Sequence, residues 1–130
     1  VLTNPTLNLQ TGYAGTFEFL VPPNNPLYDK IKNRSSMVSV FRDTTEIFYG
    51  EVRKQPKIDR YRNKNVYCAG AMSFLADSIQ PQAEYHDMTP RQMLETFLDI
   101  HNNQVEDRKK IYLGKVTITD CTGTPTLRTR

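Results

Sequence analysis

The segment Thr16–Val21 constrains the fold most, because its residues alternate in the way that a half-buried strand requires. Phe17, Phe19 and Val21 fall on one side of an extended chain, with polar residues between them. Two prolines follow directly, and proline cannot donate to a sheet ladder. The pattern predicts a strand that ends at Val21 and buries one face.

Further strand signals recur along the chain. Residues 37–41 and 47–52 flank a turn-forming stretch and predict a β-hairpin, with a bulge or a close backbone approach at Gly50. The remaining strand predictions are a short first strand around Leu7 and Leu9, a strand at 66–71, and a closing pair around Gly114 that contains Ile111, Leu113, Val116 and Ile118.

The best-defined helix is predicted from Thr89 to about Val105. Thr89 is a good N-cap, Pro90 suits the first helical position, and Gln92 completes a capping box. His101 falls on the apolar stripe of this helix, where a half-buried, hydrogen-bonded histidine is expected. Shorter helices are predicted after an Asn25 cap, at 26–31, and at 72–79. This order of elements indicates an α+β fold with a mainly antiparallel sheet, one long helix and one or two short ones.

Length and charge narrow the class of protein. The 130 residues fit one domain, 1–130, and the mid-protein character of both ends predicts a fragment of a larger protein. With 17 basic and 14 acidic residues, the net charge of +3 is too balanced to imply binding to nucleic acid or to an anionic membrane. No apolar run approaches the roughly 18 residues of a membrane span. Cys68 and Cys121 are expected to be free, buried thiols.

The reactive residue types do not form a recognisable site. His86 beside Asp87 has the composition of an acid–base pair, but a loop histidine is the favoured interpretation. Cys68 lies inside a strand pattern and not in the exposed, strained turn that a nucleophile needs. Neither the histidines nor the cysteines have the spacing of zinc ligands. The sequence therefore predicts no catalytic residue, no metal site and no cofactor.

A basic segment with aromatic neighbours is the candidate interaction site. Three interpretations stay open: a solvated hairpin edge, a contact with an acidic neighbouring subunit, and a strip for single-stranded nucleic acid. The last is the least favoured, so no specific nucleic-acid binding is expected. The candidate interface residues are Tyr49, Arg53, Lys54, Lys57, Arg60, Tyr61, Arg62 and Lys64.

The order and wording of several segments resemble the tail-associated lysin, or prophage endopeptidase tail, family of phage tail proteins from Gram-positive hosts. The resemblance covers Leu2 to Asp120. The segments that carry it are GTFEFLVPPNNPLYDKI, VSVFRDTTEIFYGEV, VYCAGAMSFLADSIQPQAEYH, IHNNQV and LGKVTITD. The family has a strand or two before the point where this chain starts, and an absent strand that belonged to this sheet would leave an open edge.

The resemblance implies a structural role in the baseplate hub of the virion. Three copies of such a protein form a ring below the distal tail protein, which closes the tail tube and opens for DNA passage. Barrel-like sheets decorated with helices are implied, with the tape measure and receptor-binding proteins as further partners. Peptidase activity, where the family has it, belongs to later domains, so this chain is not expected to be an enzyme.

Overall fold

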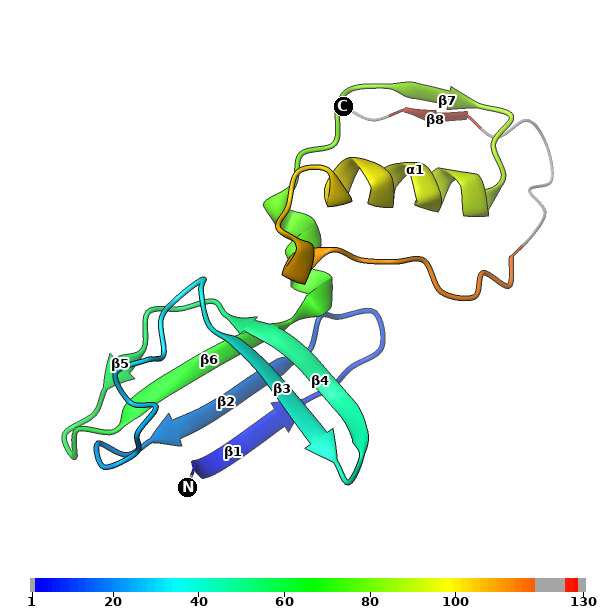
Figure 1. Cartoon of the computed structure of the whole chain (residues 1–130). Helices are drawn as coiled ribbons and strands as arrows, with labels where there is room; N and C mark the ends of the chain where they lie inside the picture. Colours follow the sequence, from blue (N-terminus) through cyan, green and yellow to red (C-terminus); the bar gives the residue numbers. More distant parts are fainter. Residues whose placement is uncertain (1, 119–125, 129–130) are drawn as a thin grey trace. The chain divides into compact units, whose positions relative to one another are not determined.

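The computed structural model describes residues 2–118 and 126–128 (Figure 1). The chain divides into two compact units, Val1–Ser73 and Phe74–Arg130. Each unit has its own internal contacts, so each is described by itself. That residues 1–130 form one domain stays a prediction.

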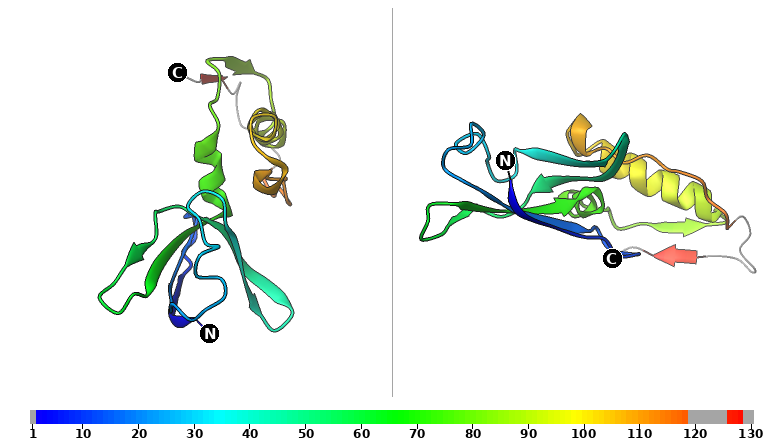
Figure 2. Two further views of the ribbon diagram at one scale, coloured as in Figure 1. Left: turned by 60° about the vertical axis from the view of Figure 1, so that its left-hand side comes forward. Right: turned by 90° about the horizontal axis from the view of Figure 1, so that it is seen from below.

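The first unit is an antiparallel sheet in the order β1-β2-β6-β4-β3, with the short β5 beside β6. The sheet bends into a half-barrel, which is seen end-on in Figure 2. This confirms the predicted α+β class with an antiparallel sheet. The strands are β1 (Thr3–Asn8), β2 (Thr16–Val21), β3 (Met37–Arg42), β4 (Thr45–Val52), β5 (Lys57–Ile58) and β6 (Lys64–Gly70).

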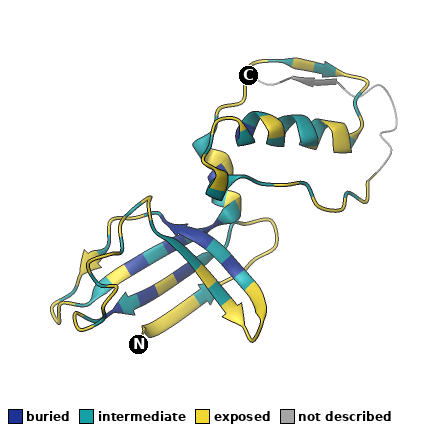
Figure 3. Cartoon of the chain, viewed as in Figure 1, coloured by how far each residue is buried: buried dark blue, intermediate teal, exposed yellow. Residues whose placement is uncertain are grey.

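The core is formed by residues of β2, β4 and β6, the strands that carry the buried stretches in Figure 3. The three residues of β2 that the alternating pattern predicts to face inward are all buried, which confirms that prediction. Each such side chain contributes about 1.5–3 kcal/mol when it leaves water. The core residues are Phe17, Phe19, Val21, Phe48, Val52, Val66 and Cys68.

Cys68 is a free thiol at the centre of this core, as predicted. Burial raises its pKa to about 12, because the apolar surroundings disfavour the thiolate. The thiol is therefore an apolar packing group and not a nucleophile. Cys121 lies outside the described residues.

Two glycines allow close backbone packing, Gly50 where β4 approaches β6 and Gly70 where β6 approaches the segment before β2. A Cβ at Gly50 would lie 2.3 Å from the Ala69 carbonyl oxygen, and one at Gly70 would lie 1.9 Å from the Ala14 carbonyl oxygen. The close approach predicted at Gly50 is confirmed. The bulge of the hairpin lies elsewhere, between Val40 and Phe41.

The short helix predicted at 26–31 is absent, and the segment forms consecutive turns instead. The Asn25 side chain does accept from the Leu27 amide at 2.9 Å, as a cap would. The following amides then bond three residues back, Tyr28 to Asn25 and Lys30 to Leu27, without reaching helical pairing. The Tyr28 hydroxyl donates to the Arg62 carbonyl at 2.6 Å, and this tertiary bond holds the turn conformation.

The second unit is built around α1 (Pro90–Asn102). The predicted capping box of Thr89 and Gln92 is present. The helix has 13 residues and ends at Asn102, before the predicted end at Val105, so it is shorter than expected. Within the described residues, no helix has the length and apolar character that crossing a bilayer would need. The other elements are η1 (Ala71–Asp77), which begins in the first unit, β7 (Glu84–His86), η2 (Asp107–Lys109) and β8 (Thr126–Arg128).

The helix predicted at 72–79 is a 3-10 helix, η1, and it buries a different residue from the one expected. Phe74 is buried, whereas Leu75 and Ile79 are 39% and 81% exposed. The 3-10 helix ends at Asp77, so Ile79 lies beyond it and does not share a helical face with Leu75.

The closing strand pair predicted around Gly114 is wrong for the described part of that segment, which has no regular structure up to residue 118. Its last residues, 119 and 120, lie outside the described residues. The small second sheet is instead formed by β7 and β8, which the sequence did not predict.

Amide side chains replace strand pairing at the end of α1. The Asn102 side chain bonds both backbone groups of Ile111, at 2.9 Å each. Gln104 does the same to Ile79, at 3.0 and 2.9 Å. These two side-chain amides, called the amide clamps, hold irregular backbone at Ile79 and Ile111. The apolar pattern of the sequence predicts a helix that ends at Ile79 and a strand that contains Ile111.

The close packing of β6 predicts a large cost for a single methyl group. Gly70→Ala is expected to lower the free energy of unfolding by at least about 2 kcal/mol, because the Ala14 backbone cannot move aside cheaply. Gly114→Ala, where nothing lies within 4 Å of the added Cβ, is the matched control and is expected to change it by less than about 0.5 kcal/mol. Urea unfolding followed by circular dichroism measures both, and equal values would contradict the packing argument.

Candidate interaction surface

The predicted basic segment divides between different faces of the first unit. Inner residues Val66 and Cys68 alternate with Tyr67, so Tyr67 lies on the outer face of the sheet. A hollow of about 150 Å³ on this face is lined by Glu18, Lys54, Gln55, Lys57, Asn65 and Tyr67. The Lys54 ammonium lies 3.9 Å from the centre of the Tyr67 ring, a cation–π distance. Lys54 and Lys57 thus meet at one outer site.

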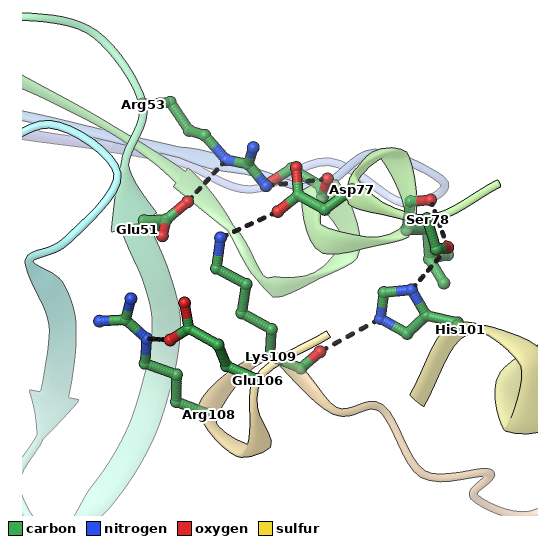
Figure 4. A network of polar contacts seen from close by, with 10 residues as sticks. Glu51, Arg53, Asp77, Ser78, His101, Glu106, Arg108 and Lys109 are labelled. Carbon is green, nitrogen blue, oxygen red and sulfur yellow. Dashed lines mark hydrogen bonds and ion pairs between the residues drawn. The ribbon is translucent and has the colours of Figure 1, made fainter. Parts of the chain in front are cut away.

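Arg53 belongs to a buried charge pair of the same unit (Figure 4). Its Nε lies 3.2 Å from Glu51 Oε2, and the two side chains are 13% and 0% exposed. Nη2 also donates to the Ser73 carbonyl at 3.1 Å. Removing one member of such a buried pair costs about 3–5 kcal/mol, because the other charge then stays buried. The position of Arg53 therefore fits a role in stability better than one in contacting a partner.

The residues Arg60, Tyr61 and Arg62 form the tip of the β5–β6 connection. The Asp59 carboxylate organises this tip: it accepts from the amides of Tyr61 and Asn63 at 2.8 Å each, and from the Asn63 side chain at 3.0 Å. The side-chain bond from Asn63, followed by the backbone bonds, holds the pKa of Asp59 below its ordinary value.

Tyr61 is the aromatic group that this tip exposes. Its side chain is 67% exposed, and the Arg60 guanidinium lies 4.7 Å from the centre of its ring. The tip therefore presents an aromatic ring and a cation together.

Lys64 faces the opposite side from Lys57. It pairs with Val21, whose side chain points inward, and its ammonium lies 4.1 Å from the centre of the Tyr28 ring. The ammonium also bonds the Tyr28 carbonyl and lies 3.6 Å from Asp29 Oδ1. Lys64 therefore anchors the 22–36 loop inside the half-barrel.

Sequence reasoning missed the aromatic partners of these cations. Tyr67 could have been found, because it alternates with buried residues and so must lie on the outer face. Tyr28 could not, since its contact with Lys64 spans a long stretch of chain. Tyr49 of the predicted set is half-buried on β4, next to inward-facing Phe48.

The two histidines have different surroundings. His86 is the last residue of β7, 57% exposed, with Nε2 at 3.4 Å from Glu84 Oε1. His101 is fully buried, which confirms a hydrogen-bonded histidine and exceeds the expected burial. Its Nδ1 lies 2.8 Å from Ser78 Oγ and its Nε2 3.2 Å from the Lys109 carbonyl (Figure 4). Because a carbonyl oxygen only accepts, Nε2 carries a proton and donates it.

The contacts of His101 are those of a structural residue. Lys109 also forms an ion pair with Asp77, at 3.0 Å. Three segments of the second unit, η1, α1 and η2, therefore meet at one polar cluster.

Comparisons with protein families, with curated proteins and with solved structures found no match for this chain. Among the described residues, no group of three or more histidine, cysteine or acidic side chains is placed to hold a metal ion. The outer hollow around Tyr67 and the tip at Arg60–Arg62, where cations lie beside aromatic rings, are the candidate interaction surface.

His101→Ala is expected to lower the free energy of unfolding by about 2–4 kcal/mol, because it leaves a cavity and removes the partners of Ser78 and of the Lys109 carbonyl. His86→Ala, at an exposed position, is the control and should change it by less than about 0.5 kcal/mol. Chemical denaturation of both variants provides the comparison. A larger effect of His86→Ala would contradict the assigned structural role.

The Asp59 turn predicts a pH-dependent tip. The pKa of Asp59 in the folded chain is lowered below its ordinary value of 3.8. The ionised carboxylate therefore stabilises the turn fully above pH 3.8, and this stabilisation is lost as the pH falls through the lowered pKa. Amide exchange at Tyr61 and Asn63 is therefore expected to lose its protection in that acid range. Asp59→Ala should abolish the protection at neutral pH, whereas Asp59→Asn, which keeps one acceptor oxygen, should retain part of it. Exchange measured by NMR that is the same in all three proteins would exclude this role.

Proposed function

We propose that this chain is a structural module of a phage or prophage tail-tip protein, within the baseplate hub. In this role it contributes to the ring that closes the tail tube and contacts the distal tail protein. The working form is a homotrimer of the full-length protein, located in the virion and made in the bacterial cytoplasm. Any peptidase activity would belong to other domains of the same protein.

The observation that carries the proposal is the antiparallel half-barrel of β1–β6. The hub resemblance implies small barrel-like sheets decorated with helices, and the segments GTFEFLV, VSVF and VYCAG that support this resemblance are strands of one sheet here. A second unit with a helix follows directly. The half-barrel sheet and the helical unit that follows it in the sequence therefore support the proposed role, because the hub resemblance implies barrel-like sheets with helices.

The candidate interaction surface supports a contact with other subunits. The outer hollow combines two ammonium groups with the half-buried ring of Tyr67, and the nearby tip exposes Tyr61 and Arg60. Aromatic and arginine side chains are enriched where proteins meet, and complementary charge fixes the register of such contacts. An acidic surface on a neighbouring hub or distal tail subunit would complement this patch.

The proposal is tested on phage particles and on the whole gene product. Antibodies raised against this chain are expected to label the tail tips of particles released from cells that carry the gene, with pre-immune serum as the control. Light scattering of the purified whole protein is expected to give the mass of a trimer. Labelling of heads or tail shafts, or a strict monomer at high concentration, would overturn the proposed role.

A further inference from the structure

The two edge strands of the half-barrel run in the same direction. Along the order β1-β2-β6-β4-β3 every neighbouring pair is antiparallel, so the first and last strands are parallel to each other. Direct pairing of β1 with β3 would therefore break the antiparallel pattern. One added strand, antiparallel to both, would continue it across the opening.

The hydrogen-bonding groups of β3 that face this opening follow from its pairing with β4. The Val52 amide donates to the Ser36 carbonyl at 3.0 Å, which puts Ser36 and Val52 at a hydrogen-bonding position of the ladder, although the Ser36 amide itself donates to the Lys32 carbonyl. Such pairs alternate along an antiparallel ladder, and Val38 is therefore bonded to β4 as well. The N–H and C=O groups of Met37 and Ser39 consequently point away from β4, toward the open edge.

An apolar hollow of about 350 Å³ lies beside this edge. Four consecutive residues, Ser36–Ser39, line it, although alternate side chains of a strand point to opposite faces. The backbone edge of β3 is therefore part of the wall. The remaining lining residues are Leu2, Phe19, Val21, Leu27, Lys30, Ile31 and Val52.

The other edge strand, β1, is a poorer template for pairing. It contains Pro5, which has no N–H group, and its register with β2 shifts between Thr3 and Thr6. Asn4 has a positive φ of 50° at the same place. Bulges and prolines are the usual means of protecting an edge, and in β3 the segment Met37–Val40 has neither.

We propose that the β3 edge is an acceptor site for an extended segment of another polypeptide. The segment adds as a strand antiparallel to β3, bonds the outward groups of Met37 and Ser39, and places alternate apolar side chains in the hollow. Lys30 is the charged residue among those that line the hollow, so the segment carries a carboxylate opposite its ammonium. The site is independent of the proposed hub role, because it requires only a peptide strand of this chemistry.

The probe for this site is a seven-residue synthetic peptide that alternates threonine with valine and carries one central glutamate. Ser39→Pro removes the outward N–H, and Ser39→Ala keeps it; neither removes a backbone group that bonds β4. Calorimetry is expected to show binding to the natural chain and at least tenfold weaker binding to Ser39→Pro than to Ser39→Ala. A peptide with lysine in place of glutamate should bind several-fold more weakly.

Amide exchange gives a second readout and a control for folding. Bound peptide should slow exchange at Met37 and Ser39 at least tenfold in the natural chain, while Val38 and Val40 stay protected with or without peptide. Retained protection at Val38 and Val40 in Ser39→Pro separates a lost donor from a misfolded strand. If Val38 and Val40 lose protection in Ser39→Pro, β3 is misfolded in that variant and its binding data are not used. The slowing of exchange at Met37 and Ser39 of the natural chain by bound peptide then tests the proposal.

Three results would overturn the proposal. The first is no detectable binding of the glutamate peptide, and the second is equal binding by the two Ser39 variants with β3 intact. The third is self-association of the peptide-free chain that Ser39→Pro abolishes, because the edge then serves a second copy. A monomeric whole protein with an intact peptide site would contradict the hub role and leave the acceptor site standing.

Discussion

The half-barrel depends on the pairing of β6 with a strand on each side. β2 pairs with β6 along its whole length on one side, and β4 and then β5 pair with it on the other. Its inward residues Val66 and Cys68 are completely buried. Gly50 lies opposite Gly70 where β4 joins β6. A side chain at Gly50 would meet the β6 backbone at Ala69, and one at Gly70 would meet the Ala14 backbone just before β2.

The same alternation decides where the charges of the molecule lie. The basic residues around β5 are close in sequence, but a strand presents successive side chains to opposite faces. Lys57 therefore reaches the outer hollow, whereas Lys64 turns inward to Tyr28. Arg53 is drawn into the pair with Glu51. The basic segment of the sequence therefore divides in space. Lys54 and Lys57 line the outer hollow, Arg60 and Arg62 lie at the tip, and Arg53 and Lys64 make contacts within the first unit.

The sequence predicts what depends on regular periodicity or on local caps. The strands at 16–21 and 37–52 and the start of α1 follow from alternation and from the Thr89 capping box, and the structure has them there. The closing strand pair predicted around Gly114 fails, as far as residue 118, for a reason that periodicity cannot detect. Its β-branched residues favour a ladder, but a single side chain, Asn102, already holds the backbone of Ile111.

The candidate surface was predictable only in part, for the same physical reason. Residue type identified the cations, and alternation could have identified Tyr67 on the outer face. Cation–π partners such as Tyr28 for Lys64 depend on how a loop folds back across the sheet, which no local pattern encodes. Likewise, burial of His101 depends on Ser78 and on the Lys109 carbonyl, which lie on other segments.

The amide clamps at the end of α1 give the second unit a particular chemical vulnerability. Each clamp needs one side-chain donor and one side-chain acceptor, directed at a single residue of the irregular chain. Hydrolysis of the amide of Asn102 or Gln104 to an acid changes few atoms, yet it places an oxygen where an N–H faced a carbonyl. An attractive contact becomes a repulsive one between two acceptors. Slow deamidation during storage would thus release the 111 and 79 segments while leaving the hydrophobic core of the first unit untouched.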